Sequence, residues 1–132
     1  MTRLRVVGLG ALALVLSNAS PAPADPIPAP KIHREATLVS RFDILVLVDF
    51  ACQEGTDTGI GVGANEPTVG VPDTNGFGFT PLEATGQRQT AQVLVHSFGG
   101  AWRVGEASAN AAVSCGQGAF GRDSAEIVIE LP

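Results

Sequence analysis

From Glu35 onward, apolar and polar residues alternate with a period of two, the pattern of half-buried β-strands. The clearest strand carries its apolar residues at every second position: Ile44, Val46, Val48, Phe50 and Cys52. Residues 107–115 and residues 125–131 show the same alternation over comparable lengths. No segment after residue 24 has the 3.6-residue period of an amphipathic helix. The pattern therefore predicts an all-β protein.

Shorter segments add further strands to this set. Residues 36–40 and 91–95 alternate clearly, residues 60–64 alternate with glycine, and residues 68–71 and 77–80 are expected to be short edge strands. Asn75-Gly76 is typical of a tight turn, because both residues accept a positive φ. About seven strands at this spacing predict an immunoglobulin-like antiparallel β-sandwich over residues 35–132.

The two cysteines, Cys52 and Cys115, each lie on the apolar face of a predicted strand. In an immunoglobulin-like order these strands are the second and the sixth, so both cysteines reach the same end of the core. We expect a disulfide, worth about 4 kcal/mol in the chain-entropy model. A metal site is disfavoured, because zinc ligands usually cluster and no Cys-x-x-Cys pair occurs. Phe98 and Trp102 are expected to fill the other end of the core.

The first 24 residues have the layout of a secretory signal peptide. Two arginines precede an apolar run over residues 6–16, and Ala22-Pro23-Ala24 forms the expected cleavage site, with cleavage after Ala19 as the alternative. The run is shorter than the roughly 20 residues that span a bilayer as a helix. We therefore expect a secreted, extracellular protein with no integral membrane segment after cleavage.

Residues 21–30 alternate proline with other residues, which predicts an extended Pro/Ala-rich tether over residues 25–34, before the folded domain. A proline-rich ligand for an aromatic groove has a similar composition, but linkers are commoner. Removal of residues 1–24 leaves six basic and thirteen acidic side chains, a net charge of −7. Such a charge repels phosphate backbones, so nucleic acid is not an expected partner.

The valine-rich strand that ends in Cys52, and the segment from Trp102 to Ala107 before an alanine-rich strand, carry a family resemblance. Over most of residues 35–131 the chain resembles small exported actinobacterial proteins of uncharacterised function with an immunoglobulin-like β-sandwich. In that group the first cysteine often pairs with a residue before the fifth strand. Residues 85–87 occupy that position here and include no cysteine, so the resemblance implies a different pairing, with Cys115.

Residues for catalysis or metal binding are few. His33 lies in or beside the tether, and His96 stands opposite the valine face of its strand, where a serine such as Ser97 or Ser114 could pair with it. Asp43 and Asp49 share a strand face but lie about 20 Å apart along it, too far for a glycosidase pair. Acidic and amide residues at 54–57 and 65–75 resemble calcium ligands but match no complete binding loop. We therefore assign no catalytic, cofactor or metal residue.

Two interpretations of function remain. The first is a non-catalytic binding module whose contact residues are Phe77 and Phe79, in a long loop over residues 65–86, with an extracellular protein or glycan as partner. These side chains could equally fold back over the core. The second is a secreted inhibitor or small-ligand carrier, although proteins of that kind usually have two disulfides and this chain can form one. A small secreted hydrolase is a further alternative.

Overall fold

The computed structural model describes residues 28–116 and 118–132, and among these residues it contains strands and no helix. The eight strands are β2 (Lys31–Ile32), β3 (Glu35–Ser40), β4 (Asp43–Ala51), β5 (Asp57–Glu66), β6 (Thr74–Glu83), β7 (Arg88–Ser97), β8 (Gly105–Cys115) and β9 (Ala119–Glu130). The prediction of an all-β protein is confirmed.

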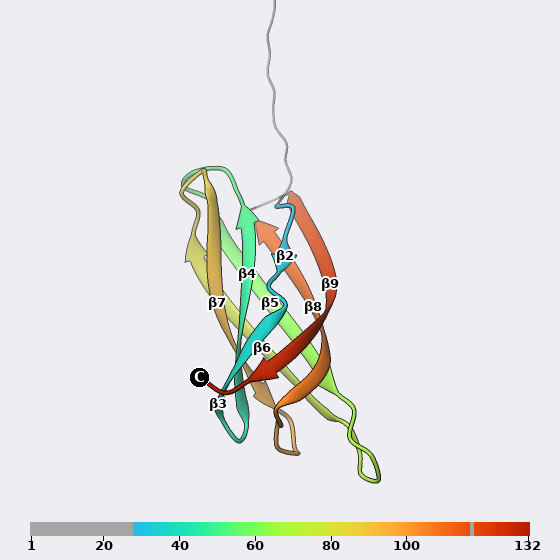
Figure 1. Ribbon diagram of the computed structural model, residues 1–132. Coiled ribbons are helices and arrows are strands. Elements are labelled where there is room, and N and C mark those ends of the chain that lie inside the picture. The colour runs from blue at the N-terminus through green and yellow to red at the C-terminus, as the bar shows by residue number, and fades with distance from the viewer. Residues whose placement is uncertain (1–27, 117) are drawn as a thin grey trace, which may run out of the picture.

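Seven of these strands form one sheet that closes on itself into a barrel (Figure 1). The order around the barrel is β3, β4, β7, β6, β5, β8 and β9, and β9 returns to β3 through a parallel pairing. β2 continues the line of β3 and pairs with the far end of β4. The predicted immunoglobulin-like sandwich, with two separate sheets, is therefore not what forms, because two extra pairings join the edges that a sandwich leaves open.

The closure is uneven along the barrel. At one end, residues 35–37 pair with residues 128–130, and residues 76–77 pair with residues 96–97. Beyond these short pairings the two pairs of strands share no further ladder residues, and side chains bridge them. Asp123 Oδ2 accepts a hydrogen bond from the Ile32 amide at 2.8 Å, and Thr80 Oγ1 donates to the Gln92 carbonyl at 3.2 Å. The barrel thus consists of two layers, fused at one end and splayed at the other.

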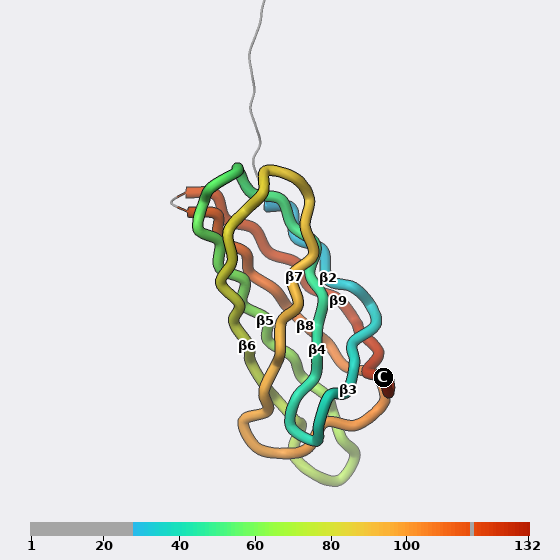
Figure 2. Tube along the Cα trace, turned by 90° about the vertical axis from the view of Figure 1, so that its left-hand side faces the viewer, coloured from blue at the N-terminus to red at the C-terminus, as the bar shows by residue number. Residues whose placement is uncertain are grey.

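One layer contains β2, β3, β4 and β7, and the other contains β5, β6, β8 and β9. Figure 2 shows β4 and β7 in front of β5 and β8. The space between the layers is filled by branched apolar side chains and one aromatic ring, all fully buried: Ile44, Val46, Val48, Phe50, Ile60, Val62, Val93, Val95, Val113 and Ile129. These residues occupy alternate strand positions, so the period-two pattern identified the inner face correctly.

Trp102 closes the fused end of the core. Its ring is buried, and its Nε1 donates a hydrogen bond to the Phe42 carbonyl at 3.1 Å. Phe98, which was expected to fill this end as well, is 77% exposed, so that prediction is wrong. The Phe98 amide bonds to the Asn75 carbonyl, and the turn that follows directs the ring into solvent.

The Cys52–Cys115 disulfide forms as predicted, with a Cα–Cα distance of 5.5 Å. Cys52 follows β4 and Cys115 ends β8, and these strands belong to different layers and are not neighbours around the barrel. The link therefore holds the layers together at the splayed end, where few backbone hydrogen bonds do so. A disulfide is typical of a non-reducing environment.

The chain packs against the barrel from Pro28, earlier than the tether predicted for residues 25–34 allows. Pro28 is fully buried, and its carbonyl accepts a hydrogen bond from the Ala51 amide at 3.0 Å. Pro28 and Pro30 both lie against Gly121 of β9. The apolar proline rings thus help to fill the splayed end. The tether was predicted from the backbone of proline, which lacks an amide hydrogen, and that property says nothing about how the ring packs. The predicted signal peptide lies outside the described residues.

Candidate functional site

The most unusual surface of the barrel is an apolar patch on the outside of β5, β6 and β7. Phe77 is 49% exposed, Phe79 is 61% exposed and Leu94 is 49% exposed. All three occupy outward positions that alternate with buried ones. We call Gly59, Gly61, Phe77, Phe79 and Leu94 the aromatic face.

Phe77 and Phe79 lie in strand β6 and not in the loop that was predicted over residues 65–86. The predicted short strand at residues 77–80 is the middle of a ten-residue strand, and residues 68–71 form no strand. Both rings are therefore fixed to a sheet, where the backbone moves less than in a loop.

The outer ends of both rings lie against glycines of β5. A Cβ built on Gly59 would stand 2.8 Å from Cζ of Phe79, and one built on Gly61 would stand 3.0 Å from Cζ of Phe77. Each phenylalanine thus covers a diagonal glycine of the neighbouring strand, an arrangement that shields glycine backbone in sheets. The glycine alternation at residues 59–63 was the sequence signal for this contact. The end of each ring packs on the sheet, while 49% of the surface of Phe77 and 61% of that of Phe79 remain exposed.

The neighbourhood of the aromatic face carries few charges. The adjoining outward positions of β8 are Asn110, Ala112 and Ser114, and Gln92 is the outward neighbour of Leu94 on β7. The first ionisable group along the face is His96, which pairs with Phe77 across the β6–β7 joint. In a chain with this excess of acidic residues, such a surface suits apolar contact better than recognition of charge.

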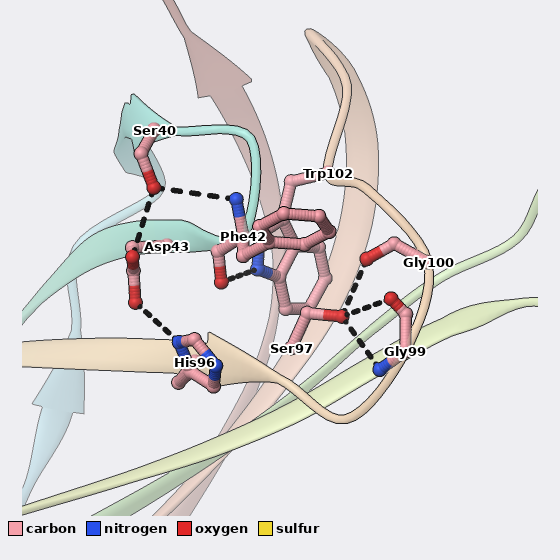
Figure 3. Close-up of polar contacts among 8 residues, drawn as sticks. All are labelled: Ser40, Phe42, Asp43, His96, Ser97, Gly99, Gly100 and Trp102. Atoms are coloured by element: carbon pink, nitrogen blue, oxygen red, sulfur yellow. Dashed lines mark hydrogen bonds and ion pairs between the residues drawn. The ribbon is translucent and has the colours of Figure 1, made fainter.

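His96 lies beside Asp43 on the outside of the barrel, near the fused end (Figure 3). Its Nδ1 donates a hydrogen bond to Asp43 Oδ1 at 2.8 Å, and Ser40 Oγ donates to Asp43 Oδ2 at 2.8 Å. These two bonds lower the pKa of the Asp43 carboxyl, the bond from His96 contributing most. The carboxylate therefore lies between the hydroxyl and the imidazole.

The order Ser40, Asp43, His96 does not form a catalytic pair of a nucleophile and its general base. A base that activates a serine must accept the hydroxyl proton directly, whereas here the Ser40 hydroxyl bonds to the carboxylate. Ser97, the other serine near His96, bonds to the backbone of Gly99 and Gly100 instead (Figure 3). The His96 side chain is 68% exposed, so water has free access to it. The cluster joins β3, β4 and β7 as a surface hydrogen-bond network.

A similar cluster surrounds Asp49 at the other end of β4. His33 Nε2 donates a hydrogen bond to Asp49 Oδ1 at 2.8 Å, and Thr90 Oγ1 donates to the same oxygen at 2.6 Å. The bond from Thr90 is the main cause that lowers the pKa of Asp49, and His33 adds to it. The sequence placed His33 in or beside the tether and offered no signal that it meets Asp49, because His33 lies between β2 and β3 while Asp49 belongs to β4.

Three of the acidic and amide residues considered for calcium, all within residues 65–75, are engaged with one another. Asn65 Nδ2 donates to Asn75 Oδ1 at 2.6 Å and to Asp73 Oδ2 at 3.3 Å, so these oxygens already have a partner. No group of three or more His, Cys, Asp or Glu side chains suited to hold a metal ion occurs within residues 28–116 and 118–132.

Glu66 is a buried acid that the sequence did not single out. Its carboxyl group lies at the fused end, and Oε1 accepts a hydrogen bond from the Arg103 amide at 2.8 Å. Burial raises the pKa of Glu66, and the bond from Arg103 opposes this only in part. Glu66 thus ties the end of β5 to the segment before β8. It has no contact with the aromatic face that would make it part of that surface.

In the described part of the chain, no helix is long and apolar enough to cross a membrane. No protein-family model matches the chain, and no curated protein matches it in sequence.

Proposed function

We propose that this protein is an extracellular, non-catalytic binding module that docks its aromatic face onto an apolar surface of another extracellular protein. The observation that carries this proposal is the exposure of Phe77, Phe79 and Leu94 on one rigid face without an adjacent carboxylate. Aromatic side chains supply much of the energy at protein interfaces, because they bury a large area at a small cost in entropy.

The same geometry favours a protein partner over a glycan. Sugar recognition combines ring stacking with several hydrogen bonds to hydroxyl groups. The aromatic face offers two phenyl rings, a leucine and glycine backbone already covered by those rings. A partner with apolar side chains would fit this surface better than a polyhydroxylated one.

The alternative of a small-ligand carrier has less support. A carrier of this architecture would hold its ligand between the layers, as small ligand-binding barrels do. Here the interior is occupied by closely packed apolar side chains such as Phe50, Val62 and Val93. Because these side chains fill the interior formed by the described residues, the outer surface is the better candidate for binding.

The test compares the wild-type domain with a Phe77→Ser/Phe79→Ser variant, both immobilised and cross-linked to proteins of the culture supernatant of the producing cells. We expect a specific partner to be retained by the wild type and lost from the variant. Cross-links should map to β5, β6 and β7. A matched control, Phe98→Ser/Phe120→Ser, removes two exposed rings elsewhere and should retain the partner.

Fluorescence of Trp102, which is buried at the fused end, reports whether each variant is folded. Equal capture by the wild type and the Phe77/Phe79 variant would refute the proposal. Cross-links confined to other faces of the barrel would refute it as well.

A further inference from the structure

Strand β9 has one edge that is only partly used. On one side it pairs with β8 continuously from Ala119 to Ile129. On the other side it pairs with β3 at residues 128–130 only. Between these residues and Gly121, where Pro28 and Pro30 are packed, the second edge of β9 meets no strand in a regular ladder.

The direction of the free backbone groups follows from the register. The Val128 amide donates to the Arg34 carbonyl, so even-numbered residues of β9 direct their backbone groups away from β8. The ladder to β8 has no register shift, and the same direction holds for Arg122, Ser124 and Glu126. Three amides and three carbonyls therefore point into the opening between β9 and β2.

This opening is a surface groove of about 890 Å³, bounded by residues 29–35 on one side and residues 123–126 on the other. β2 reaches β9 there through the inward Asp123 carboxylate, which accepts the Ile32 amide in place of a backbone carbonyl. Ala125 points inward as well, yet it is only partly buried, whereas the next inward residue, Ile127, is buried. The edge of β9 is thus reachable from outside.

Exposed edges of this kind pair readily with other strands unless charge, proline or a bulge prevents it. Between Arg122 and Glu126 the edge has no proline and no bulge. It carries two exposed charges of opposite sign, one near each end of the free stretch. Among the described residues, neither Arg122 nor Glu126 forms an ion pair. Arg122 is instead held over the Phe120 ring, 5.2 Å from its centre.

We propose that the free edge of β9 pairs with the same edge of a second copy of this chain. The two strands run antiparallel around a two-fold axis at Ser124, so Ser124 faces Ser124 of the second copy. Arg122 then faces Glu126 of the second copy, and Glu126 faces its Arg122. Such an isologous contact forms two opposite-charge pairs and up to six backbone hydrogen bonds.

Charge selects this register among its neighbours. A two-fold axis at Arg122 or at Glu126 would place like charges directly opposite each other, which destabilises a strand pair. An axis at Asp123 or Ala125 would leave both opposite-charge pairs unformed. β3 at one end and the proline contacts with Gly121 at the other confine the pairing to residues 122–126.

The contact leaves the aromatic face free, because β8 separates β9 from β5 around the barrel. A dimer would therefore present two aromatic faces to a partner. Such bivalency increases the apparent affinity without any new contact at the aromatic face itself.

The test is sedimentation equilibrium of the mature protein over a concentration series that reaches about 1 mM, since a small contact is expected to be weak. We expect a monomer–dimer equilibrium. Arg122→Glu and Glu126→Arg should each weaken it about tenfold or more, because each replaces two attractive pairs by two repulsive ones. The double variant Arg122→Glu/Glu126→Arg should restore the dimer. Ser124→Pro, which removes only an edge amide, should abolish it.

Two control variants change the net charge equally without touching the edge. Arg41→Glu matches Arg122→Glu, since Arg41 also lies over a neighbouring phenylalanine ring. Glu83→Arg matches Glu126→Arg, because Glu83 is exposed on β6, which β5 and β8 separate from β9. Both controls should dimerise like the wild type.

A wild-type protein that remains monomeric throughout the series would overturn the proposal. Failure of the double variant to regain dimerisation would overturn it as well. Residues 122 and 126 of one strand lie about 13 Å apart and cannot compensate each other within one chain, so recovery must come from pairs between two copies. Neither result would affect the proposed role of the aromatic face, which is measured by partner capture.

Discussion

Replacement of Cys52 and Cys115 by alanine should destabilise this protein by about 4 kcal/mol. The disulfide joins residues that are 63 positions apart, and the chain-entropy relation for a loop of that length gives this value. Small domains have net stabilities of about 5–15 kcal/mol, so the double variant should be barely stable. The structure adds a spatial prediction, because the disulfide holds the two layers together only where their strands splay.

Without the disulfide, the splayed end should open before the rest of the barrel unfolds. Two amides report on that end: Ala51, bonded to the Pro28 carbonyl, and Gly116, bonded to the Asp57 carbonyl. Two others report on the fused end: Phe98, bonded to the Asn75 carbonyl, and Trp102, bonded to the Arg41 carbonyl. In the variant, hydrogen exchange should accelerate at the first pair well beyond the change at the second.

Urea unfolding followed by Trp102 fluorescence measures the global effect, and amide exchange by NMR measures the local one. The wild type, in the same buffer without reductant, is the reference. A loss of stability below about 1 kcal/mol would contradict the loop-entropy argument. Equal acceleration of exchange at both ends would contradict the division of the barrel into a fused and a splayed end.

Two further predictions concern single positions. Gly78→Ala should destabilise the fold by about 3 kcal/mol in urea unfolding, because its Cβ would collide with the backbone carbonyl of Leu94, which cannot move aside. Gly59→Ala, the matched control, meets only the end of the Phe79 ring and should cost less than about 1 kcal/mol; equal losses would refute the distinction. Glu66→Gln should stabilise the protein at neutral pH, since it keeps an acceptor for the Arg103 amide without a buried charge. The raised pKa of Glu66 means that the folded chain retains a proton that the unfolded chain has released, so wild-type stability should fall as pH rises from about 4.5 through the folded pKa. The Gln variant should lack this part of the pH dependence, and identical profiles for the two proteins would show that Glu66 is not responsible.

The sequence alone determined which segments are extended and which side of each faces inward. Side chains of a strand alternate between two faces, so Ile44 to Phe50 identify both the strand and its buried face. The disulfide could also be predicted from the sequence, because the chain has only two cysteines and both lie on apolar strand faces. These features depend on local periodicity and on chemistry that a linear pattern records.

The closure of the sheet, the fate of residues 65–86 and both histidine clusters were decided by the tertiary structure. Glycine and proline weaken a strand signal, yet Gly78 is needed in β6 because β7 crosses too closely for any side chain. His96 meets Asp43 across 53 residues of sequence, a distance over which periodicity carries no information. The position of Phe77 and Phe79 likewise depends on which strand lies beside β6, since a side chain at Gly59 or Gly61 of β5 would meet the end of a ring. Pairing between distant strands sets all of these features, and local pattern does not encode it.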